Sequence, residues 1–152
     1  EEFKQQGNSF VQQDKFKEAI ECYTKAIDIE PFNDAAAPIY SNRSMCHLNL
    51  GMNLEAFQDA GACCGLRPEW AKGFARRGDA AKALKRWEVA LESYNKYLEL
   101  DPEDSCEVKR DRNLVMKIVQ AKKKEALFWK LVGLALVLSS PTLIPYGPHR
   151  GS

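Results

Sequence analysis

Residues 16–31 read FKEAIECYTKAIDIEP, a stretch in which apolar side chains recur at helical spacing before a proline. One face of such a helix carries the following residues: Phe16, Ala19, Ile20, Tyr23, Ala26 and Ile27. Pro31 ends the helix, because proline has no amide hydrogen to donate and its ring clashes with the preceding turn. The stretch therefore predicts an amphipathic helix that stops just before residue 31.

The same pattern occurs three times along the chain, ending at Pro31, Pro68 and Pro102. Twelve residues before these prolines stand three alanines: Ala19, Ala56 and Ala90. Eight residues before them stand Tyr23, Ala60 and Tyr94. The prolines are 37 and 34 residues apart, so the first link holds three extra residues, which fall at 34–37 before Pro38. The chain is therefore built from internal repeats.

Each repeat also contains an earlier apolar stripe, which predicts a second helix. In the first repeat this stripe consists of Phe3, Gly7, Phe10 and Val11, and Asp14 and Lys15 form the turn after it. A single pair of helices cannot bury its apolar face alone. The sequence therefore predicts that the pairs stack on one another.

This pattern resembles the tetratricopeptide repeat family, whose unit of about 34 residues is a helix–turn–helix. The positions that carry the resemblance are Gly7, Ala19, Tyr23 and Pro31, then Ser44, Ala56, Ala60 and Pro68, then Gly78, Ala90, Tyr94 and Pro102. The resemblance implies an all-α, right-handed solenoid of three repeats in residues 1–103, with units at about 1–33, 37–70 and 71–103.

Residues 104–138 are expected to form a capping helix with an apolar extension, followed by a flexible tail at 139–152. Glu107 stands three residues after Asp104, as in a capping box. The stripe that would face the last pair consists of Val108, Leu114, Val115, Ile118 and Val119. A final repeat needs such a cover, because its apolar face is otherwise in water.

In this family the first helix of each pair lines a concave groove, and five residues on these helices form what we call the donor cluster: Lys4, Asn8, Asn42, Lys72 and Arg76. Lysine supplies a point charge, arginine a planar fork and asparagine a neutral amide donor, and the cluster contains no acid. Such a set suits a ligand with two neighbouring carboxylates, as on a C-terminal aspartate.

The donor cluster also matches the two-carboxylate clamp of the family's chaperone-binding members. The resemblance implies a co-chaperone or adaptor that binds the Glu-Glu-Val-Asp tail of the 90-kDa or 70-kDa heat-shock chaperones. Three apolar residues either floor the groove or pack in the core: Val11, Met45 and Leu48. Arg43 and Arg77 are interpreted as surface or inter-repeat pairing residues. Asp79, expected beside Lys82, either pairs locally or repels acidic residues of the tail.

Alternatives remain for the ligand. The array could be a scaffold, or a membrane-anchored targeting receptor, that recognises another acidic or internal peptide. The first repeat begins almost at residue 1, which suggests that the chain is cut from a longer protein.

Composition limits the remaining functions. With 22 basic and 21 acidic residues the net charge is +1, so nothing in the overall charge favours nucleic acid. The five cysteines (Cys22, Cys46, Cys63, Cys64, Cys106) form no CxxC pair and are interpreted as small buried residues in a reducing compartment. No catalytic constellation, metal site or cofactor motif is present. A cytoplasmic or nuclear protein without enzyme activity in this segment is expected.

Residues 126–138 form an apolar run of 13 residues that is interrupted by Lys130 and preceded by three lysines at 122–124. Three interpretations stay open: a membrane tail anchor that continues to residue 144, docking or self-association of the extended helix, and a splice-derived end. A spanning helix needs about 20 apolar residues, and Pro141 disfavours an extension.

Overall fold

The computed structural model describes residues 1–103 and 106–138, which form seven α-helices and one short 3₁₀ turn. In chain order these are α1 (Glu2–Gln12), α2 (Phe16–Ile29), η1 (Asp34–Ala36), α3 (Ala37–Asn49), α4 (Asn53–Leu66), α5 (Ala71–Ala83), α6 (Trp87–Leu100) and α7 (Cys106–Leu138). The chain divides after Val119 into two units. The first holds α1 to α6 and the start of α7, and the described part of the second is the rest of α7.

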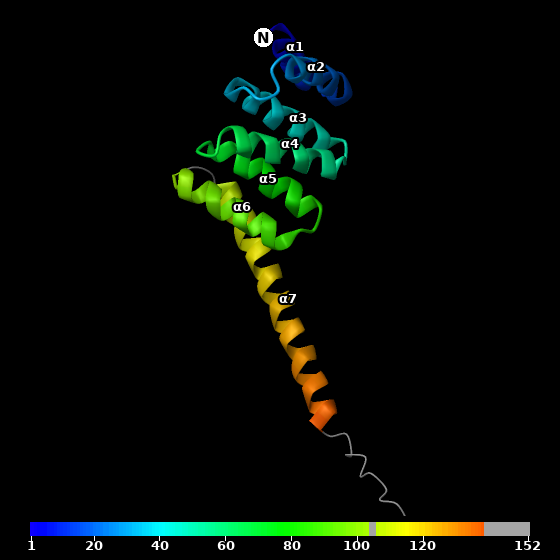
Figure 1. The fold of residues 1–152 in the computed structure, drawn as a ribbon, viewed down its shortest axis with the longest axis vertical. Coiled ribbons are helices and arrows are strands. Elements are labelled where there is room, and N and C mark those ends of the chain that lie inside the picture. The colour runs from blue at the N-terminus through cyan, green and yellow to red at the C-terminus, as the bar shows by residue number, and fades with distance from the viewer. Residues whose placement is uncertain (104–105, 139–152) are drawn as a thin grey trace, which may run out of the picture. The chain divides into compact units, whose positions relative to one another are not determined.

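In the first unit the helices pack as antiparallel pairs, α1 with α2, α3 with α4 and α5 with α6. The pairs then stack in chain order through α2 against α3 and α4 against α5, as Figure 1 shows. The first helices of the second and third pairs, α3 and α5, also contact each other directly. The all-α stack of helix pairs predicted from the sequence is confirmed.

Each pair turns at a residue in the left-handed region, Asp14 (φ 57°), Gly51 (φ 73°) and Lys85 (φ 58°). The amide of the following residue then bonds five residues back, as from Lys15 N to Phe10 O at 2.9 Å. This bond satisfies a carbonyl that the helix end leaves free. Only the middle turn has a glycine, so aspartate and lysine accept a conformation that L-residues rarely adopt.

Two glycines let the helices of the first and third pairs approach closely. A Cβ atom on Gly7 would lie 2.5 Å from Tyr23 Cε1, and one on Gly78 would lie 2.4 Å from Tyr94 Cε1. Neither distance leaves room for a methyl group. The tyrosine ring in each pair therefore lies flat against the first helix, and its hydroxyl reaches the residue that follows the glycine.

The three extra residues of the first link form η1, in which Asn33 Oδ1 accepts a hydrogen bond from Ala35 N at 2.9 Å. Pro38 stands in the first turn of α3, where its missing amide hydrogen costs no helical bond. The sequence predicted where the extra residues lie and that a helix starts at Pro38, but not the 3₁₀ turn.

The first part of α7 covers the last pair, through Val115 and Val119, which are buried with Ala90 and Tyr94. The prediction for Leu114 is wrong, since 53% of this residue is exposed. Leu114 precedes Val115 by one residue and so points about 100° away from it. The predicted capping box includes Asp104, which lies outside the described residues, as does the predicted tail at 139–152.

The cysteine prediction is correct for three of five residues. Cys22, Cys46 and Cys63 are buried, Cys64 is half-buried and Cys106 is exposed, and all five are free thiols. Cys106 differs because it begins α7 on the outer surface. Among the described residues no group of histidine, cysteine and acidic side chains has the arrangement that would hold a metal ion.

Candidate functional site

Two members of the donor cluster touch each other although they come from different repeats. Asn42 Nδ2, on α3, donates to Asn8 Oδ1, on α1, at 3.1 Å. The hydroxyl of Tyr23 donates to the same oxygen at 2.7 Å. An amide oxygen accepts two hydrogen bonds, so Asn8 is left with only its Nδ2 donors for a ligand.

Tyr23 keeps this arrangement at any working pH. It is 1% exposed, and burial raises the pKa of its hydroxyl to about 12. The hydroxyl therefore stays protonated and remains a donor to Asn8. Because the ring fits only beside a residue without a side chain, Gly7 is part of what orients Asn8.

Lys4 lies one helical turn before Asn8 on α1. Its Nζ is 3.5 Å from Glu1 Oε1, and its side chain is 28% exposed. At this distance and exposure the ion pair is weak. Lys4 can therefore exchange this partner for a carboxylate of a ligand.

Lys72 and Arg76 line one hollow of about 380 Å³ at the start of α5, together with Trp70, Tyr97 and Asp101. Arg76 is partly buried, and its Nε has no hydrogen-bond partner within residues 1–103 and 106–138. A buried donor without a partner costs free energy. The Nε–H group of Arg76 is thus a buried donor that its neighbours leave unsatisfied.

The charges of Lys72 and Arg76 also act on the buried thiol of Cys63. Burial raises the pKa of the Cys63 thiol to about 12, while the nearby Arg67, Arg76 and Lys72 act in the opposite direction. The cations therefore do not activate this thiol as a nucleophile.

Asp79 pairs locally, as in the first of the two alternatives left open by the sequence, and repulsion of a tail by Asp79 stays a prediction. Its Oδ1 accepts a hydrogen bond from Tyr94 at 2.8 Å, and its Oδ2 lies 3.6 Å from Arg76 Nη1. Burial raises the pKa of the Asp79 carboxyl above its usual value, although Tyr94, Lys82 and Arg76 act to lower it. Lys82, expected beside Asp79, forms its ion pair with Asp111 of α7.

The structure thus brings the donor cluster together in two groups. Asn8 and Asn42 are in contact between α1 and α3, with Lys4 one helical turn before Asn8, and Lys72 and Arg76 line one hollow at the start of α5. Since α3 contacts α5, the helix that carries Asn42 lies between the two groups. This arrangement offers amide, ammonium and guanidinium donors to an anionic ligand.

The apolar residues proposed for the groove floor are half-buried. Val11 and Met45 pack against the core cluster around Ala19 and Tyr23. Leu48 is half-buried on α3. Core packing therefore accounts for Val11 and Met45, and their contact with a ligand stays a prediction.

The sequence did not predict a buried charged network beside Asn42. Arg43 donates from Nε to Asp59 Oδ2 at 2.9 Å and from Nη2 to Asp59 Oδ1 at 2.7 Å. Its Nη1 donates to Thr24 Oγ1 at 2.9 Å, and His47 Nδ1 lies 3.1 Å from Asp59 Oδ2. Arg43 was expected to lie on the surface or to pair between repeats. The signal that could have located its partner is the spacing of 16 residues, at which Arg77 also meets Ser93.

Burial acts to raise the pKa of Asp59, but the nearby His47 and the two hydrogen bonds from Arg43 outweigh it and hold the pKa below its usual value. Asp59 is therefore ionised at neutral pH. The network joins α2, α3 and α4, and so fixes the helix that presents Asn42.

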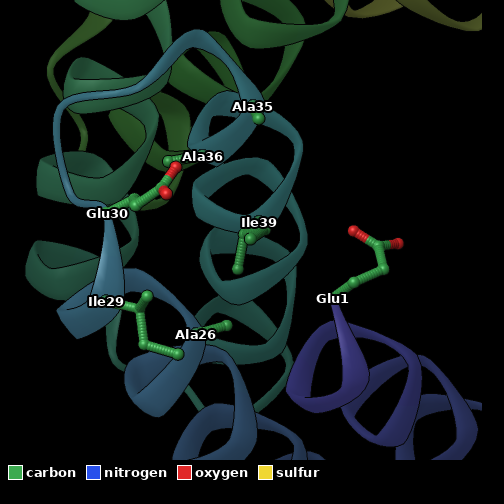
Figure 2. Close-up of a pocket in the computed structure, with 7 residues that line it drawn as sticks. All are labelled: Glu1, Ala26, Ile29, Glu30, Ala35, Ala36 and Ile39. Atoms are coloured by element: carbon green, nitrogen blue, oxygen red, sulfur yellow. The ribbon is translucent and has the colours of Figure 1, made fainter.

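A second hollow, of about 170 Å³, lies where the start of α1, the end of α2 and the start of α3 meet (Figure 2). It is lined by the apolar Ile29 and Ile39 and by two acids, Glu1 and Glu30. Glu30 accepts a hydrogen bond from Asn33 at 2.7 Å. With two carboxylates and no basic side chain in its lining, this hollow does not suit an anionic ligand.

Comparison with known proteins gives matches over most of the described chain. Two family models, both described as tetratricopeptide repeat, match residues 1–33 and residues 71–104. Hsp70-Hsp90 organizing protein 3 of Arabidopsis thaliana is 35% identical over 123 residues, which is 81% of this chain and 22% of that protein. The chain spans between 17% and 23% of the length of the first curated relatives it matches.

Two solved structures of peptide complexes are also similar. The first TPR of Spaghetti (RPAP3) bound to the HSP90 peptide SRMEEVD has a TM-score of 0.71 and 30% identity, covering 78% of this chain and 93% of that chain. The second TPR domain of human RPAP3, in complex with the HSP70 peptide SGPTIEEVD, has a TM-score of 0.69 and 30% identity. That match covers 75% of this chain and 92% of the other.

Proposed function

This chain belongs to the tetratricopeptide repeat family, and we propose that it binds the acidic C-terminal Glu-Glu-Val-Asp tails of 90-kDa and 70-kDa heat-shock chaperones as a co-chaperone or adaptor module. In this proposal the donor cluster is a two-carboxylate clamp. The ligand is a free chain end whose last residue is aspartate, with its α-carboxylate and its side-chain carboxylate close together.

The observation that carries the proposal is the hydrogen bond between Asn8 and Asn42. These residues are 34 positions apart, and they meet across the first helices of the first two repeats. The bond leaves donors of both amides at one place, one turn from the Lys4 ammonium. Binding of two carboxylates needs donors from separate repeats at one place, and this contact supplies them.

The second group supports the same function. The partly exposed guanidinium of Arg76 and the exposed Lys72 provide a fork and a point charge for a second carboxylate. The similar domains of RPAP3 hold peptides that end in Glu-Glu-Val-Asp, which is the ligand class that these donors suit.

Calorimetric titration with tail peptides tests the proposal. A short flexible peptide must be ordered on binding, so we expect micromolar affinity, about −8 kcal/mol. A peptide ending in Met-Glu-Glu-Val-Asp as the free acid should bind about tenfold or more tightly than the same peptide with an amidated C-terminus, because amidation removes one charged acceptor. Equal affinity for the two peptides would refute the clamp.

Competition separates this function from a scaffold that holds another acidic or internal peptide. If the groove binds chaperone tails, the free-acid tail peptide displaces any other ligand that uses the donor cluster. A partner that stays bound at saturating tail peptide uses a different surface. Titration with both tail peptides also gives the preference between the two chaperones.

A further inference from the structure

The described end of the chain exposes an apolar surface that the proposed function does not use. In residues 126–138, which we call the apolar segment, eight large apolar side chains are between 58% and 79% exposed: Leu127, Phe128, Trp129, Leu131, Leu134, Leu136, Val137 and Leu138. The segment is the last part of the helix α7. Exposed apolar surface of this extent marks an interaction site.

The apolar side chains surround the helix instead of forming a stripe. Successive residues turn by about 100° in an α-helix, so these eight side chains leave no sector wider than about 80° without a large apolar group. A partner helix or a second copy covers one face, and the seam it needs repeats every three or four residues. A helix that is apolar all round suits surroundings that contact every side, as lipid chains do.

The residues that precede the apolar segment add a positive charge at one end. The three lysines of residues 122–124, which we call the basic flank, are all exposed. They come directly before the apolar segment, apart from Glu125. A cluster of lysines beside an apolar helix is attracted to the anionic headgroups of a membrane surface. Trp129 and Phe128 follow the basic flank closely, and aromatic side chains of this kind favour the membrane interface.

The length of the segment determines how it can enter a membrane. Its 13 residues extend about 20 Å, whereas the hydrocarbon core of a bilayer is about 30 Å thick. Within residues 1–103 and 106–138 no helix is both long enough and apolar enough to cross a membrane. Lys130 lies near the start of the segment, where a lysine can extend its ammonium group back to the headgroups.

We propose that residues 126–138 insert into an anionic membrane surface while the basic flank binds the lipid phosphates, so that the repeats are held at a membrane. This goes beyond tail binding and does not depend on it. Lipid is the partner that fits this surface best, because the lysines complement anionic headgroups and because the apolar side chains face all directions.

Flotation with lipid vesicles tests the proposal on the full chain of 152 residues. Vesicles of phosphatidylcholine and phosphatidylserine in equal parts should carry the protein upward in a density gradient, and vesicles of phosphatidylcholine alone should carry much less. Replacing the three lysines of residues 122–124 by glutamine should lower the partition coefficient on the mixed vesicles about a hundredfold. Leu131→Asp combined with Leu134→Asp should abolish flotation on both.

Matched controls separate these effects from net charge and from unfolding. Replacing Lys17, Lys25 and Lys85 by glutamine removes the same charge from exposed sites in the repeats and should leave flotation unchanged. Leu54→Asp, at a residue 48% exposed on α4, should also leave it unchanged. Circular dichroism of every variant shows whether the repeats remain folded.

Three outcomes overturn the membrane proposal without touching tail binding. The first is that the folded wild-type chain stays at the bottom of the gradient with both kinds of vesicle. The second is that the two leucine substitutions leave flotation intact. The third is that the chain forms a stable dimer in sedimentation experiments and ignores vesicles, in which case the apolar segment binds a second copy.

Discussion

Asp59→Asn should destabilise the repeats more than any change to an exposed ion pair. The substitution keeps the shape of the side chain but removes the negative charge that faces the Arg43 guanidinium. Both side chains are buried, with 16% of Arg43 and 7% of Asp59 exposed. The two hydrogen bonds between them are 2.9 Å and 2.7 Å long. Asparagine offers a single oxygen where the carboxylate offers two.

The size of the effect follows from this burial. Breaking a buried ion pair by removing one partner costs about 3–5 kcal/mol, because the other charge is left without compensation. Arg43 keeps its bond to Thr24 and some contact with water, so we place the loss at the lower end, about 3 kcal/mol. Glu92→Gln is the matched control, since Glu92 is 71% exposed and 3.5 Å from Arg77. Its loss should stay below about 1 kcal/mol.

The pH dependence of this loss has a definite sign. The folded-state pKa of Asp59 is lower than the value of about 3.9 expected in the unfolded chain. The ionised carboxylate therefore contributes its stability above about pH 4, and this contribution disappears as pH falls through the folded-state pKa. The difference between the wild-type chain and Asp59→Asn should be constant near neutral pH and should shrink below about pH 4.

Urea unfolding followed by circular dichroism measures both quantities. The wild-type chain, Asp59→Asn and Glu92→Gln are compared at neutral pH and again at acidic pH, with the free energies extrapolated to water. If the Asp59→Asn loss equals that of Glu92→Gln, the buried pair does not stabilise the second repeat as argued. A loss that remains unchanged in acid would show that the charge of Asp59 is not its cause.

Three further predictions concern single residues. Arg76→Ala should weaken binding of the free-acid tail peptide about tenfold or more in calorimetry while helicity by circular dichroism stays the same, and unchanged affinity would remove Arg76 from the clamp. Gly7→Ala should cost about 1–3 kcal/mol in urea unfolding, because the new methyl group meets Tyr23, whereas Gly61→Ala, with open space at its Cβ position, should gain about 0.5–1 kcal/mol. Asp79→Asn should raise the free energy of unfolding at neutral pH, because the raised folded-state pKa of Asp79 means that its charge destabilises the folded chain. This gain should vanish in acid, where the carboxyl is protonated in both states. A variant that is less stable than the wild-type chain at neutral pH would contradict this prediction.

The repeat pattern predicted the helix pairs because it marks positions that packing requires. Ala19, Ala56 and Ala90 are each fully buried at equivalent places, where a larger side chain would separate the helices. The prolines and the apolar stripes fixed where helices begin and end. These features follow from local periodicity, which a single sequence displays directly.

The polar contacts could not be predicted in the same way, because equivalent positions hold different chemistry. The pair of positions 16 residues apart holds Gln6 and Cys22 in the first repeat and Arg43 and Asp59 in the second. The repeat indicates that these positions meet but does not indicate whether they form a weak contact or a buried ion pair. For the same reason the donor cluster was found through its resemblance to known clamps, whereas the bond between Asn8 and Asn42 required coordinates.

The same contact between a tyrosine ring and a glycine positions both Asn8 and Asp79, which lie beside the proposed ligand site. In the first pair Tyr23 lies on Gly7 and donates to Asn8, and in the third pair Tyr94 lies on Gly78 and donates to Asp79.

The two tyrosine hydroxyls act alike, since burial raises the pKa of both and keeps both protonated. The difference lies in the acceptor. The side-chain oxygen of Asn8 accepts the hydrogen bond from Tyr23, and the amide nitrogen of Asn8 stays available as a donor. An ionised Asp79 has no donor, and its Oδ2 lies 3.6 Å from Arg76 Nη1. The geometry is therefore set by the repeat, and the sign of the charge is set by a single residue within it. In the third pair carboxylate binding must rest on Lys72 and Arg76, and a carboxylate that binds Arg76 must compete with Asp79 for the guanidinium.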